Sequence, residues 1–258
     1  MPLVSPAVYA KERIAEIQAY SLLSGRAVGN LVSSPRYWAD IFTQMDSIGV
    51  GSLPIVILTG FFTGCVLALQ SATALKSFGS VALTGNLVAL SMVKELGPVL
   101  TGLMVSGRNA SGMASELGSM KVTEQIDAMR ALGTDPVRKL VTPRITATVF
   151  MLFFLTILSD AVGIAGGALV SVTLLGLSAS AYLHNSYRAL VYSDVVQGLT
   201  KALFFGFIIA SVGCYFGMNT KGGTQGVGRS TTQAVVVSSV AIIVIDFLIS
   251  RAFIGLFS

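Results

Sequence analysis

Five long apolar segments dominate this chain and determine what it can fold into. They lie at about 50–75, 81–107, 145–175, 195–217 and 234–257. A helix needs about 20 residues to cross a hydrocarbon core of about 30 Å, and each segment is near or above that length. Because 53% of the residues are hydrophobic and only 11% are charged, a soluble domain of 258 residues is excluded. The sequence therefore predicts an all-α integral membrane protein with five transmembrane helices.

The residues before the first segment are too polar to cross a membrane, but they have a pattern. Apolar residues alternate with charged ones between residues 8 and 32, which is typical of a helix that lies in the headgroup region. Arg36, Tyr37 and Trp38 follow, a basic and aromatic combination that anchors chains at membrane interfaces. We expect an interfacial N-terminal helix in residues 1–45, a five-span bundle in residues 50–257, and one domain over residues 1–258.

The one long polar stretch, residues 108–144, has a helical period of its own. Gly133, Asp135 and Pro136 form a stop signal near its middle. On pattern alone, the stretch is either an interfacial helix that joins the second and third spans or a docking surface for a soluble partner. Its apolar residues recur at three- and four-residue steps, as in an amphipathic helix: Met113, Leu117, Met120, Ile126, Met129 and Leu132.

Lysine and arginine are distributed unevenly over the two sides of the predicted bundle. Twelve of the seventeen fall in the N-terminal segment, the 108–144 stretch and the 218–233 loop, whereas three fall on the opposite side. Loops rich in lysine and arginine remain in the cytoplasm. We therefore expect a cytoplasmic N-terminus, a cytoplasmic 108–144 stretch and a C-terminus on the outer side.

Four charged residues lie well inside the predicted spans: Lys94, Glu95, Lys201 and Asp246. On insertion scales a charge at the centre of a span costs about 2.5–3.5 kcal/mol, so such groups face the bundle interior or a wet cavity and find partners. We expect Lys201 to pair with Glu95 or with Asp246. These pairs either fix helix register or form a polar patch in a translocation cavity that meets a charged headgroup.

The last third of the first span carries a candidate apolar wall. Leu67, Ala74, Leu75 and Phe78 fall at i, i+7, i+8 and i+11, on one face of a helix. That face could contact an acyl chain in a cavity, but a lipid-facing or helix-packing stripe has the same spacing. Small residues four apart in three spans also predict close helix packing: Gly60/Gly64, Gly163/Gly167 and Gly213/Gly217.

Other motifs give no catalytic, metal or nucleotide site. Gly223 to Ser230 resembles a phosphate-binding loop, but Arg229 replaces its lysine and no strand precedes it, so we expect a flexible glycine loop. Cys65 and Cys214 lie in apolar runs, and His184 is the only histidine in the sequence. We expect no catalytic residue, no metal, no cofactor bound by this chain and, without a basic and aromatic surface stripe, no nucleic-acid partner.

Two strings carry a resemblance to a known family: KELGP at Lys94–Pro98, and EQIDAMRALGTDPVRKLVTPR from Glu124 to Arg144. With them, nearly the whole chain resembles the MlaE/YrbE permease family of bacterial lipid-transport ABC systems. The resemblance implies the permease subunit of an ABC-type transporter in the bacterial inner membrane. Such a transporter moves glycerophospholipids between that membrane and a periplasmic MCE-domain carrier, and so maintains outer-membrane lipid asymmetry. The implied partners are a second copy of the chain, a cytoplasmic ABC ATPase dimer that binds ATP and Mg, a STAS-domain protein and a hexameric MCE-domain protein.

The resemblance also implies roles for individual residues. It places a cytoplasmic coupling helix in residues 108–144, with polar ATPase contacts from Glu116, Glu124, Asp127, Arg130 and Asp135. It assigns Lys94, Glu95, Lys201 and Asp246 to a substrate cavity, with Leu67, Ala74, Leu75 and Phe78 as the acyl-chain wall. The family more often carries arginine where this chain has Lys94, and lysine acts as a point charge rather than a fork that grips phosphate twice.

Two other functions remain open at this level. An autonomous ion-coupled carrier would use Glu95 and Asp246 as proton or cation sites and would work without ATPase subunits. A structural scaffold for other membrane subunits would use the same charges only to set helix register.

Overall fold

The computed structural model describes residues 6–31 and 37–257, which form helices joined by short connections, without any strand in these two ranges. Arg36, part of the predicted interfacial anchor, lies outside them. Five helical stretches in the described part are long and apolar enough to cross a membrane, so the predicted all-α, five-span fold is confirmed. These stretches are Trp38–Lys76, Val81–Val122, Val137–Thr173, Tyr192–Met218 and Gly223–Gly255.

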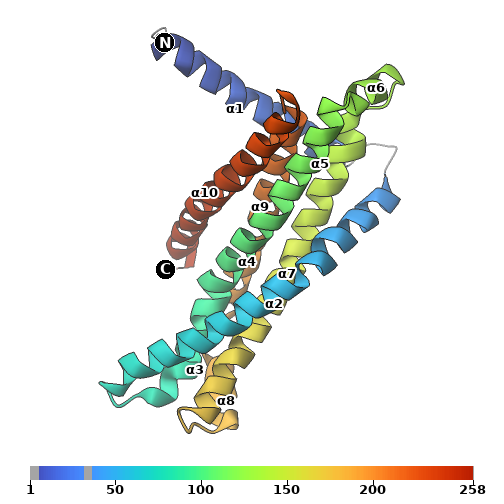
Figure 1. Ribbon diagram of the computed structural model, residues 1–258. Helices are drawn as coiled ribbons and strands as arrows, with labels where there is room; N and C mark the ends of the chain where they lie inside the picture. The colour runs from blue at the N-terminus through green and yellow to red at the C-terminus, as the bar shows by residue number, and fades with distance from the viewer. Residues whose placement is uncertain (1–5, 32–36, 258) are drawn as a thin grey trace.

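The spans form an elongated bundle (Figure 1). Helix α1 (Pro6–Gly29) crosses one end of it at a steep angle, close to the short α6 (Gln125–Ala131), and α8 (Ala179–Ala189) lies at the other end. We call these the α6 end and the α8 end. Four spans are formed by α2 (Trp38–Lys76), η4 with α7 (Val137–Val141, Thr142–Thr173), α9 (Tyr192–Met218) and α10 (Gly223–Phe257).

The second span is one continuous helical run with two π-helical turns in it. It consists of η1 (Val81–Leu83), α3 (Thr84–Ser91), η2 (Met92–Leu96), α4 (Gly97–Val105), η3 (Ser106–Ala110) and α5 (Ser111–Val122). The π turns are η2 and η3. Single π turns inside α-helices are rare and are frequent at functional sites.

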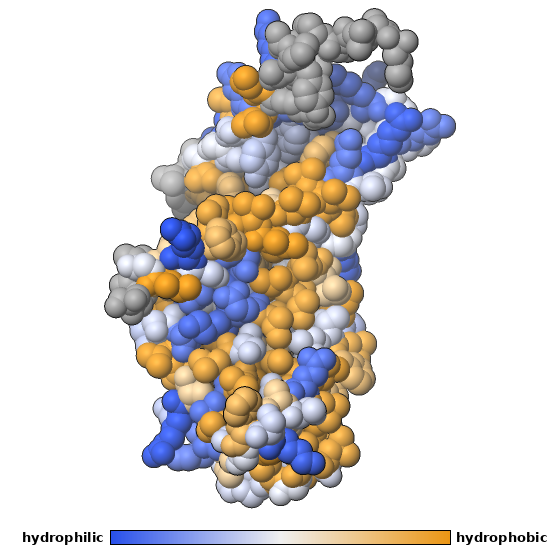
Figure 2. Space-filling model, turned by 90° about the vertical axis from the view of Figure 1, so that its left-hand side faces the viewer, coloured by the Kyte–Doolittle hydropathy of each residue, from blue (hydrophilic) through white to orange (hydrophobic). Residues whose placement is uncertain are grey.

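The spans extend beyond their predicted limits at the α6 end. The second span continues to Val122 instead of residue 107, and the last begins at Gly223 instead of residue 234. With 42 residues, the second span is roughly 63 Å long at 1.5 Å per residue, about twice the hydrocarbon thickness. Figure 2 shows hydrophobic side chains over much of the middle of one face, interrupted by a hydrophilic patch at mid-height, and further hydrophilic side chains toward the two ends. Helices therefore project out of the membrane at the α6 end.

This extension corrects the prediction of a separate amphipathic helix in residues 108–144. Met113 and Leu117 lie on α5, where they are buried against α9, and Leu117 fits beside Gly217. Glu124, with a φ of 61°, breaks the helix, and α6 adds only seven residues. The predicted stop is confirmed, because Gly133 has a φ of 78° that side chains rarely allow.

The prediction of a flexible glycine loop from Gly223 to Ser230 is also wrong. Gly223–Ser230 forms the first turns of α10, so the connection from α9 is only residues 219–222. Helix α7 passes through Gly163 and Gly167 without a break. These two glycines allow close packing, since a Cβ at Gly163 would lie 2.3 Å from Met92 Cε and one at Gly167 would lie 2.5 Å from Tyr182 Oη. The predicted close helix packing is confirmed.

Candidate functional site

The π turn η2 presents Lys94 and Glu95 to two different neighbours. Lys94 Nζ lies 2.9 Å from Asp194 Oδ1 on α9. Glu95 Oε2 lies 2.5 Å from Lys201 Nζ, also on α9, and Glu95 Oε1 accepts a 3.0 Å hydrogen bond from Ser250 on α10. Consecutive residues of one span thus connect to two others.

Lys201 is the centre of this arrangement. Its side chain is 0% exposed, yet its ammonium has three oxygen neighbours: Glu95 Oε2, Asp246 Oδ1 at 2.8 Å and the Lys94 carbonyl at 2.9 Å. Two of these contacts are hydrogen bonds, to Glu95 Oε2 and to the Lys94 carbonyl, and the contact with Asp246 is an ion pair, so oxygen atoms compensate the buried charge. Both pairs considered from the sequence form at once. We call Lys94, Glu95, Asp194, Lys201 and Asp246 the membrane charge cluster.

The spacing on α9 explains how the cluster assembles. Asp194, Gly198 and Lys201 occupy i, i+4 and i+7, which is one face of a helix. A Cβ at Gly198 would lie 2.0 Å from the Val93 carbonyl oxygen, so only glycine lets η2 approach this closely. Asp194 was not among the site residues predicted from the sequence. Its spacing of seven residues from Lys201 was the sequence signal that would have included it.

The cluster has a buried half and an open half. Lys201 and Asp246 have side-chain exposures of 0% and 20%, whereas Lys94 and Glu95 have 37% and 42%. With every member ionised, three carboxylates and two ammonium groups leave one negative charge in excess. The open half offers an ammonium and a carboxylate next to each other, which suits a ligand that carries both polar and charged groups.

An apolar groove lies between α2 and the end of η2. Leu67 and Phe62 of α2 line a groove of about 340 Å³ with Leu96, the residue after Glu95. Ala74 and Leu75 lie farther along α2. Phe78 does not share their face, because α2 ends at Lys76.

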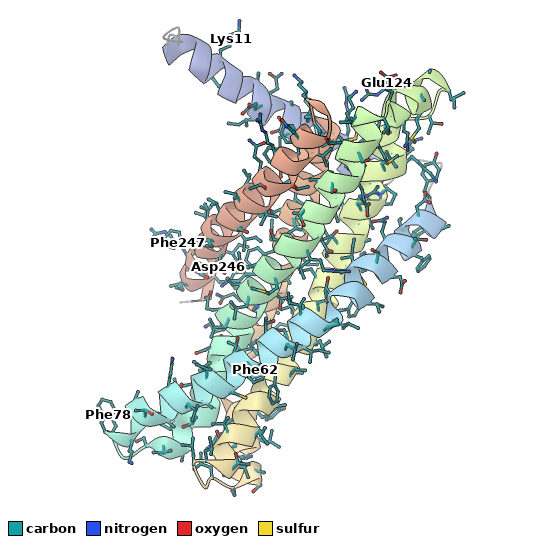
Figure 3. The ribbon with its side chains drawn as sticks, viewed as in Figure 1. Lys11, Phe62, Phe78, Glu124, Asp246 and Phe247 are labelled. Atoms are coloured by element: carbon teal, nitrogen blue, oxygen red, sulfur yellow. The ribbon has the colours of Figure 1, made fainter. Side chains whose placement is uncertain are left out.

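Phe78 instead lies in the turn before Gly79, whose φ is 65°, with 80% of its side chain exposed. Figure 3 shows it at the α8 end, far from Asp246. The single four-residue wall predicted from the sequence is therefore wrong in its geometry. Acyl-chain contact by Leu67, Ala74 and Leu75 stays a prediction.

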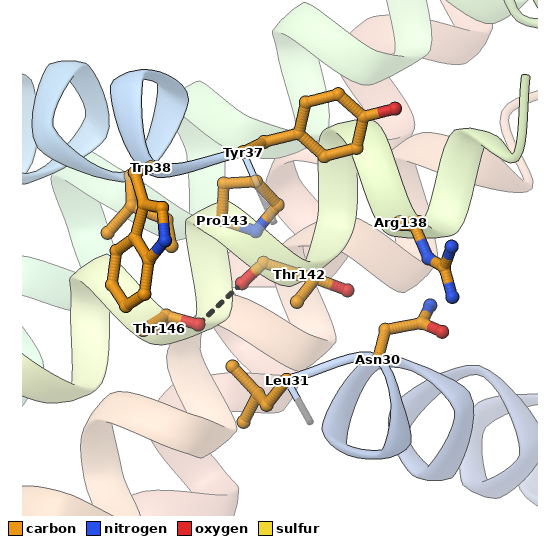
Figure 4. Close-up of a pocket in the computed structure, with 9 residues that line it drawn as sticks. Asn30, Leu31, Tyr37, Trp38, Arg138, Thr142, Pro143 and Thr146 are labelled. Atoms are coloured by element: carbon orange, nitrogen blue, oxygen red, sulfur yellow. Dashed lines mark hydrogen bonds between the residues drawn. The ribbon is translucent and has the colours of Figure 1, made fainter. Parts of the chain in front are cut away.

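A second apolar groove, of about 450 Å³, lies between α1, α9 and α10 and was not predicted. Tyr20 of α1 donates or accepts a 2.7 Å hydrogen bond with Ser211, and its ring packs edge-on against Tyr215 at 5.7 Å. These contacts fasten α1 to α9. A smaller pocket of about 60 Å³ lies where α1, α2 and η4 meet (Figure 4), and its size excludes a lipid.

The five residues predicted to contact an ATPase separate into two groups. Glu116 lies on α5, and its carboxylate is 2.9 Å from Arg144 of α7, so it links two spans. Asp135 accepts a 2.9 Å hydrogen bond from the Val137 backbone N–H and caps η4. The other three, Glu124, Asp127 and Arg130, are exposed at the start and along α6.

Asp127 is the electrostatic centre of residues 121–132, which comprise α6 and its flanking residues and which we call the α6 turn. Its carboxylate lies 2.7 Å from Lys121 Nζ and 3.1 Å from Arg130 Nη1. The hydrogen bond from Lys121, together with the charges of Lys121 and Arg130, holds the pKa of Asp127 below its usual value. The turn therefore keeps a fixed pattern of charge at neutral pH.

Exchanging the partners of the Lys94–Asp194 pair tests the geometry of the open half. We expect Lys94→Asp alone to destabilise the protein by about 1–3 kcal/mol, because it places a carboxylate against Asp194. Lys94→Asp with Asp194→Lys restores opposite charges and is expected to recover most of the loss. Thermal unfolding in detergent measures both, and a double variant no better than the single one would contradict the pairing.

The family model described as Permease MlaE matches residues 41–252. A probable ABC transporter permease protein of Rickettsia felis is 44% identical over 237 residues, 92% of each chain. The Arabidopsis thaliana protein TRIGALACTOSYLDIACYLGLYCEROL 1, chloroplastic, is 38% identical over 232 residues, 90% of this chain and 66% of its own. The intermembrane phospholipid transport system permease protein MlaE of Haemophilus influenzae is 34% identical over 231 residues, 88% of each chain. This chain is therefore a multi-pass membrane permease that belongs to the MlaE permease family.

Proposed function

We propose that this permease is the transmembrane subunit of an ABC-type transporter that moves glycerophospholipids. The observation that carries the proposal is the η2 turn, which contributes Lys94 and Glu95 to the open half of the membrane charge cluster and Leu96 to an apolar groove. A phospholipid needs both environments, since its headgroup is charged and its chains are apolar. The name of the Haemophilus influenzae relative supports the same substrate class.

The proposed assembly has two copies of this chain in the bacterial inner membrane. The α6 end and the N-terminus face the cytoplasm, in agreement with the excess of lysine and arginine there, and the C-terminus belongs to the periplasmic side. A cytoplasmic ABC ATPase dimer would bind ATP and Mg. A STAS-domain protein and a hexameric periplasmic MCE-domain protein complete the system, which would maintain outer-membrane lipid asymmetry.

The α6 turn is suited to receive the ATPase. Leu132, just beyond α6, is 84% exposed although it is apolar, and Arg130 beside it has 55% of its side chain exposed. Exposed apolar residues with a polar rim mark contact surfaces. Ile126, on the other face of α6, is 0% exposed and belongs to the same buried cluster as Leu117 of α5.

This packing connects the α6 turn to the membrane charge cluster. A partner that moves α6 also moves α5, because Ile126 is fixed in the common core. From Val122 to Lys94 the second span is one unbroken helical run. The hypothesised mechanism is that ATP binding closes the ATPase dimer, α6 follows, and the cavity between the two copies closes and displaces the lipid.

An ion-coupled carrier is less well supported by the cluster. Its two acids, Glu95 and Asp246, both lie against the buried ammonium of Lys201, so a fixed cation already occupies the position between them. A site that binds and releases protons or cations needs carboxylates that are free to exchange them. A permease driven by a partner ATPase has no such requirement.

Variants of the α6 turn test the proposal in the assembled complex. We expect Leu132→Asp to weaken ATPase retention by at least about tenfold, as for a residue at the centre of a contact. Asp127→Lys, which reverses the charge held by Lys121 and Arg130, is expected to release the ATPase or to uncouple its hydrolysis from lipid transfer. Leu174→Asp is the matched control, because Leu174 is 67% exposed in a turn at the α8 end.

The readouts are ATPase co-purification, ATP hydrolysis, and transfer of phosphatidylethanolamine and phosphatidylglycerol from nanodiscs. Wild type and Leu174→Asp should retain the ATPase and transfer lipid. If both α6 variants keep assembly, hydrolysis and transfer at the wild-type level, α6 is not the docking surface. If the wild-type complex transfers no phospholipid with ATP, the proposed substrate is wrong.

A further inference from the structure

The second π turn, η3, holds an arginine that the proposed function does not use. Arg108 Nη1 donates to the Ser47 carbonyl at 3.2 Å and to Ser52 Oγ at 3.1 Å, both on α2. No described carboxylate forms an ion pair with it, and the residue is exposed. Arg108 lies where the apolar part of this span ends, and an arginine with no acid partner at that level can bind an anionic headgroup.

Two features of the surroundings fix the guanidinium in place. A Cβ at Gly51 would lie 2.3 Å from Arg108 Nη2, so the guanidinium lies directly on the α2 backbone and an alanine there would displace it. Ser52, which is 0% exposed, also accepts a 3.4 Å hydrogen bond from Asn109 Nδ2, and Asn109 is 7% exposed. Nη1 is thus held by the buried Ser52 hydroxyl and by the carbonyl of the exposed Ser47, while the N–H donors of Nη2 and Nε remain for a ligand.

The position along the span matches a headgroup. Arg108 is thirteen residues beyond Glu95, roughly 20 Å along the helix toward the α6 end. There α2 and α5 diverge (Figure 1), so the arginine lies between helices that separate toward the cytoplasm. A guanidinium at this level binds a phosphate with two parallel hydrogen bonds more readily than a lysine does.

An apolar stripe continues from this point into the membrane. Ile55, Leu58 and Phe62 follow Gly51 at i+4, i+7 and i+11 on the same face of α2, and their exposures are 37%, 57% and 60%. Eleven residues span roughly 16 Å, about half of the hydrocarbon core and hence one leaflet. The stripe ends at Phe62, which lines the groove between α2 and Leu96 of η2.

We propose that Arg108 binds the phosphate of a phospholipid in the cytoplasmic leaflet, with an acyl chain along Ile55, Leu58 and Phe62. The inference rests on the proposed function and extends it with a second lipid site, at the opposite end of the stripe from the membrane charge cluster. The site recognises the phosphodiester common to glycerophospholipids rather than one headgroup. A lipid held there is positioned to enter or leave the groove along α2.

Four variants of the full-length protein test this site. Arg108→Gln removes the charge, Arg108→Lys keeps the charge without the fork, and Gly51→Ala keeps the arginine but displaces it from α2. Gly112→Ala is the control, because a Cβ there meets nothing within 4 Å. Thermal unfolding in detergent without added lipid first shows whether each variant is folded.

Each folded variant is then titrated with dihexanoyl phosphatidylglycerol and with dihexanoylglycerol, which lacks the phosphate. Wild type and Gly112→Ala should bind the phospholipid more tightly than the diacylglycerol. Arg108→Gln and Gly51→Ala should lose about tenfold in phospholipid affinity, the loss of one charge-assisted hydrogen bond, with Arg108→Lys in between.

An unchanged preference for phosphatidylglycerol in both Arg108→Gln and Gly51→Ala would overturn the proposal. The proposal would also be overturned if these variants kept their preference for phosphatidylglycerol but lost the dimer or the ATPase, because Arg108 would then belong to a protein interface. Lipid transfer by the wild-type complex is measured separately. The wild-type complex could fail to transfer lipid while the preference for the phosphate still depends on Arg108. That result would refute the proposed function and would still support this lipid site.

Discussion

Replacing Lys201 with methionine is expected to abolish lipid transfer and to destabilise the protein severely. Methionine has a similar length but no charge, so Glu95 and Asp246 lose the ammonium that lies 2.5 Å and 2.8 Å from them. Removing one partner of a buried ion pair costs about 3–5 kcal/mol. Because Glu95 is 42% exposed and keeps its hydrogen bond from Ser250, we expect the loss of stability to lie near the lower end of this range. Thermal unfolding and ATP-driven lipid transfer are the two measurements.

A triple variant separates the two roles of the cluster. Lys201→Met with Glu95→Gln and Asp246→Asn contains no unpaired charge, so we expect its stability to recover toward wild type. Transfer is expected to stay lost, because the open half of the cluster no longer offers a carboxylate. Recovery of both stability and transfer would show that these charges only set helix register, and wild-type behaviour of Lys201→Met alone would contradict the central role of Lys201.

The pairing of Lys201 could be predicted from the sequence because its physical reason is local and strong. An ammonium inside an apolar span needs a carboxylate, and few were available within the predicted spans. Asp194 was not predicted as a site residue because it lies at the start of α9, where a charged residue is not unusual. Only the close approach of η2, which Gly198 permits, brings Lys94 to it.

The number of spans could be predicted, but the ends of the helices could not. Hydropathy shows where a helix enters apolar surroundings, and a helix that projects into water continues without that signal. Residues 106–122 stay helical despite their polarity because Met113 and Leu117 pack on α9. The first turns of α10 contain three glycines and resemble a loop for the same reason, since the tertiary contacts that order them lie far away in the sequence.

The α6 turn shows a different limit to what the sequence alone can predict. The apolar period through residues 113–132 was real, but it belongs to two helices separated by the left-handed Glu124. A non-glycine residue with positive φ is uncommon and gives little signal in a single sequence. As a result, Glu116 was assigned to a loop surface, whereas it lies on α5 and pairs with Arg144.

Placing a methyl group on Gly64 is expected to disrupt the most extensive helix contact in the described bundle, that of α2 with α7. A Cβ at this position would lie 1.8 Å from the Gly163 carbonyl oxygen and 2.5 Å from its carbonyl carbon. Both atoms belong to the backbone, so neither can rotate away. Overpacking a close contact costs about 1–3 kcal/mol and occasionally more, and we expect Gly64→Ala to reach or exceed the upper figure.

Gly112→Ala again provides the matched control, because a Cβ at Gly112 meets nothing within 4 Å. Replacing glycine with alanine inside a helix by itself stabilises the helix by about 0.8–1 kcal/mol, so the control should be as stable as wild type or more stable. The difference in unfolding temperature between the two variants then measures the destabilisation that comes from the α2–α7 contact. Separating α2 from α7 also frees Met92 of η2, whose Cε packs on Gly163, so we expect Gly64→Ala to lose lipid transfer as well. Equal stability of Gly64→Ala and Gly112→Ala would show that the two helices can move apart without cost, and that close glycine packing does not hold the charge cluster in place.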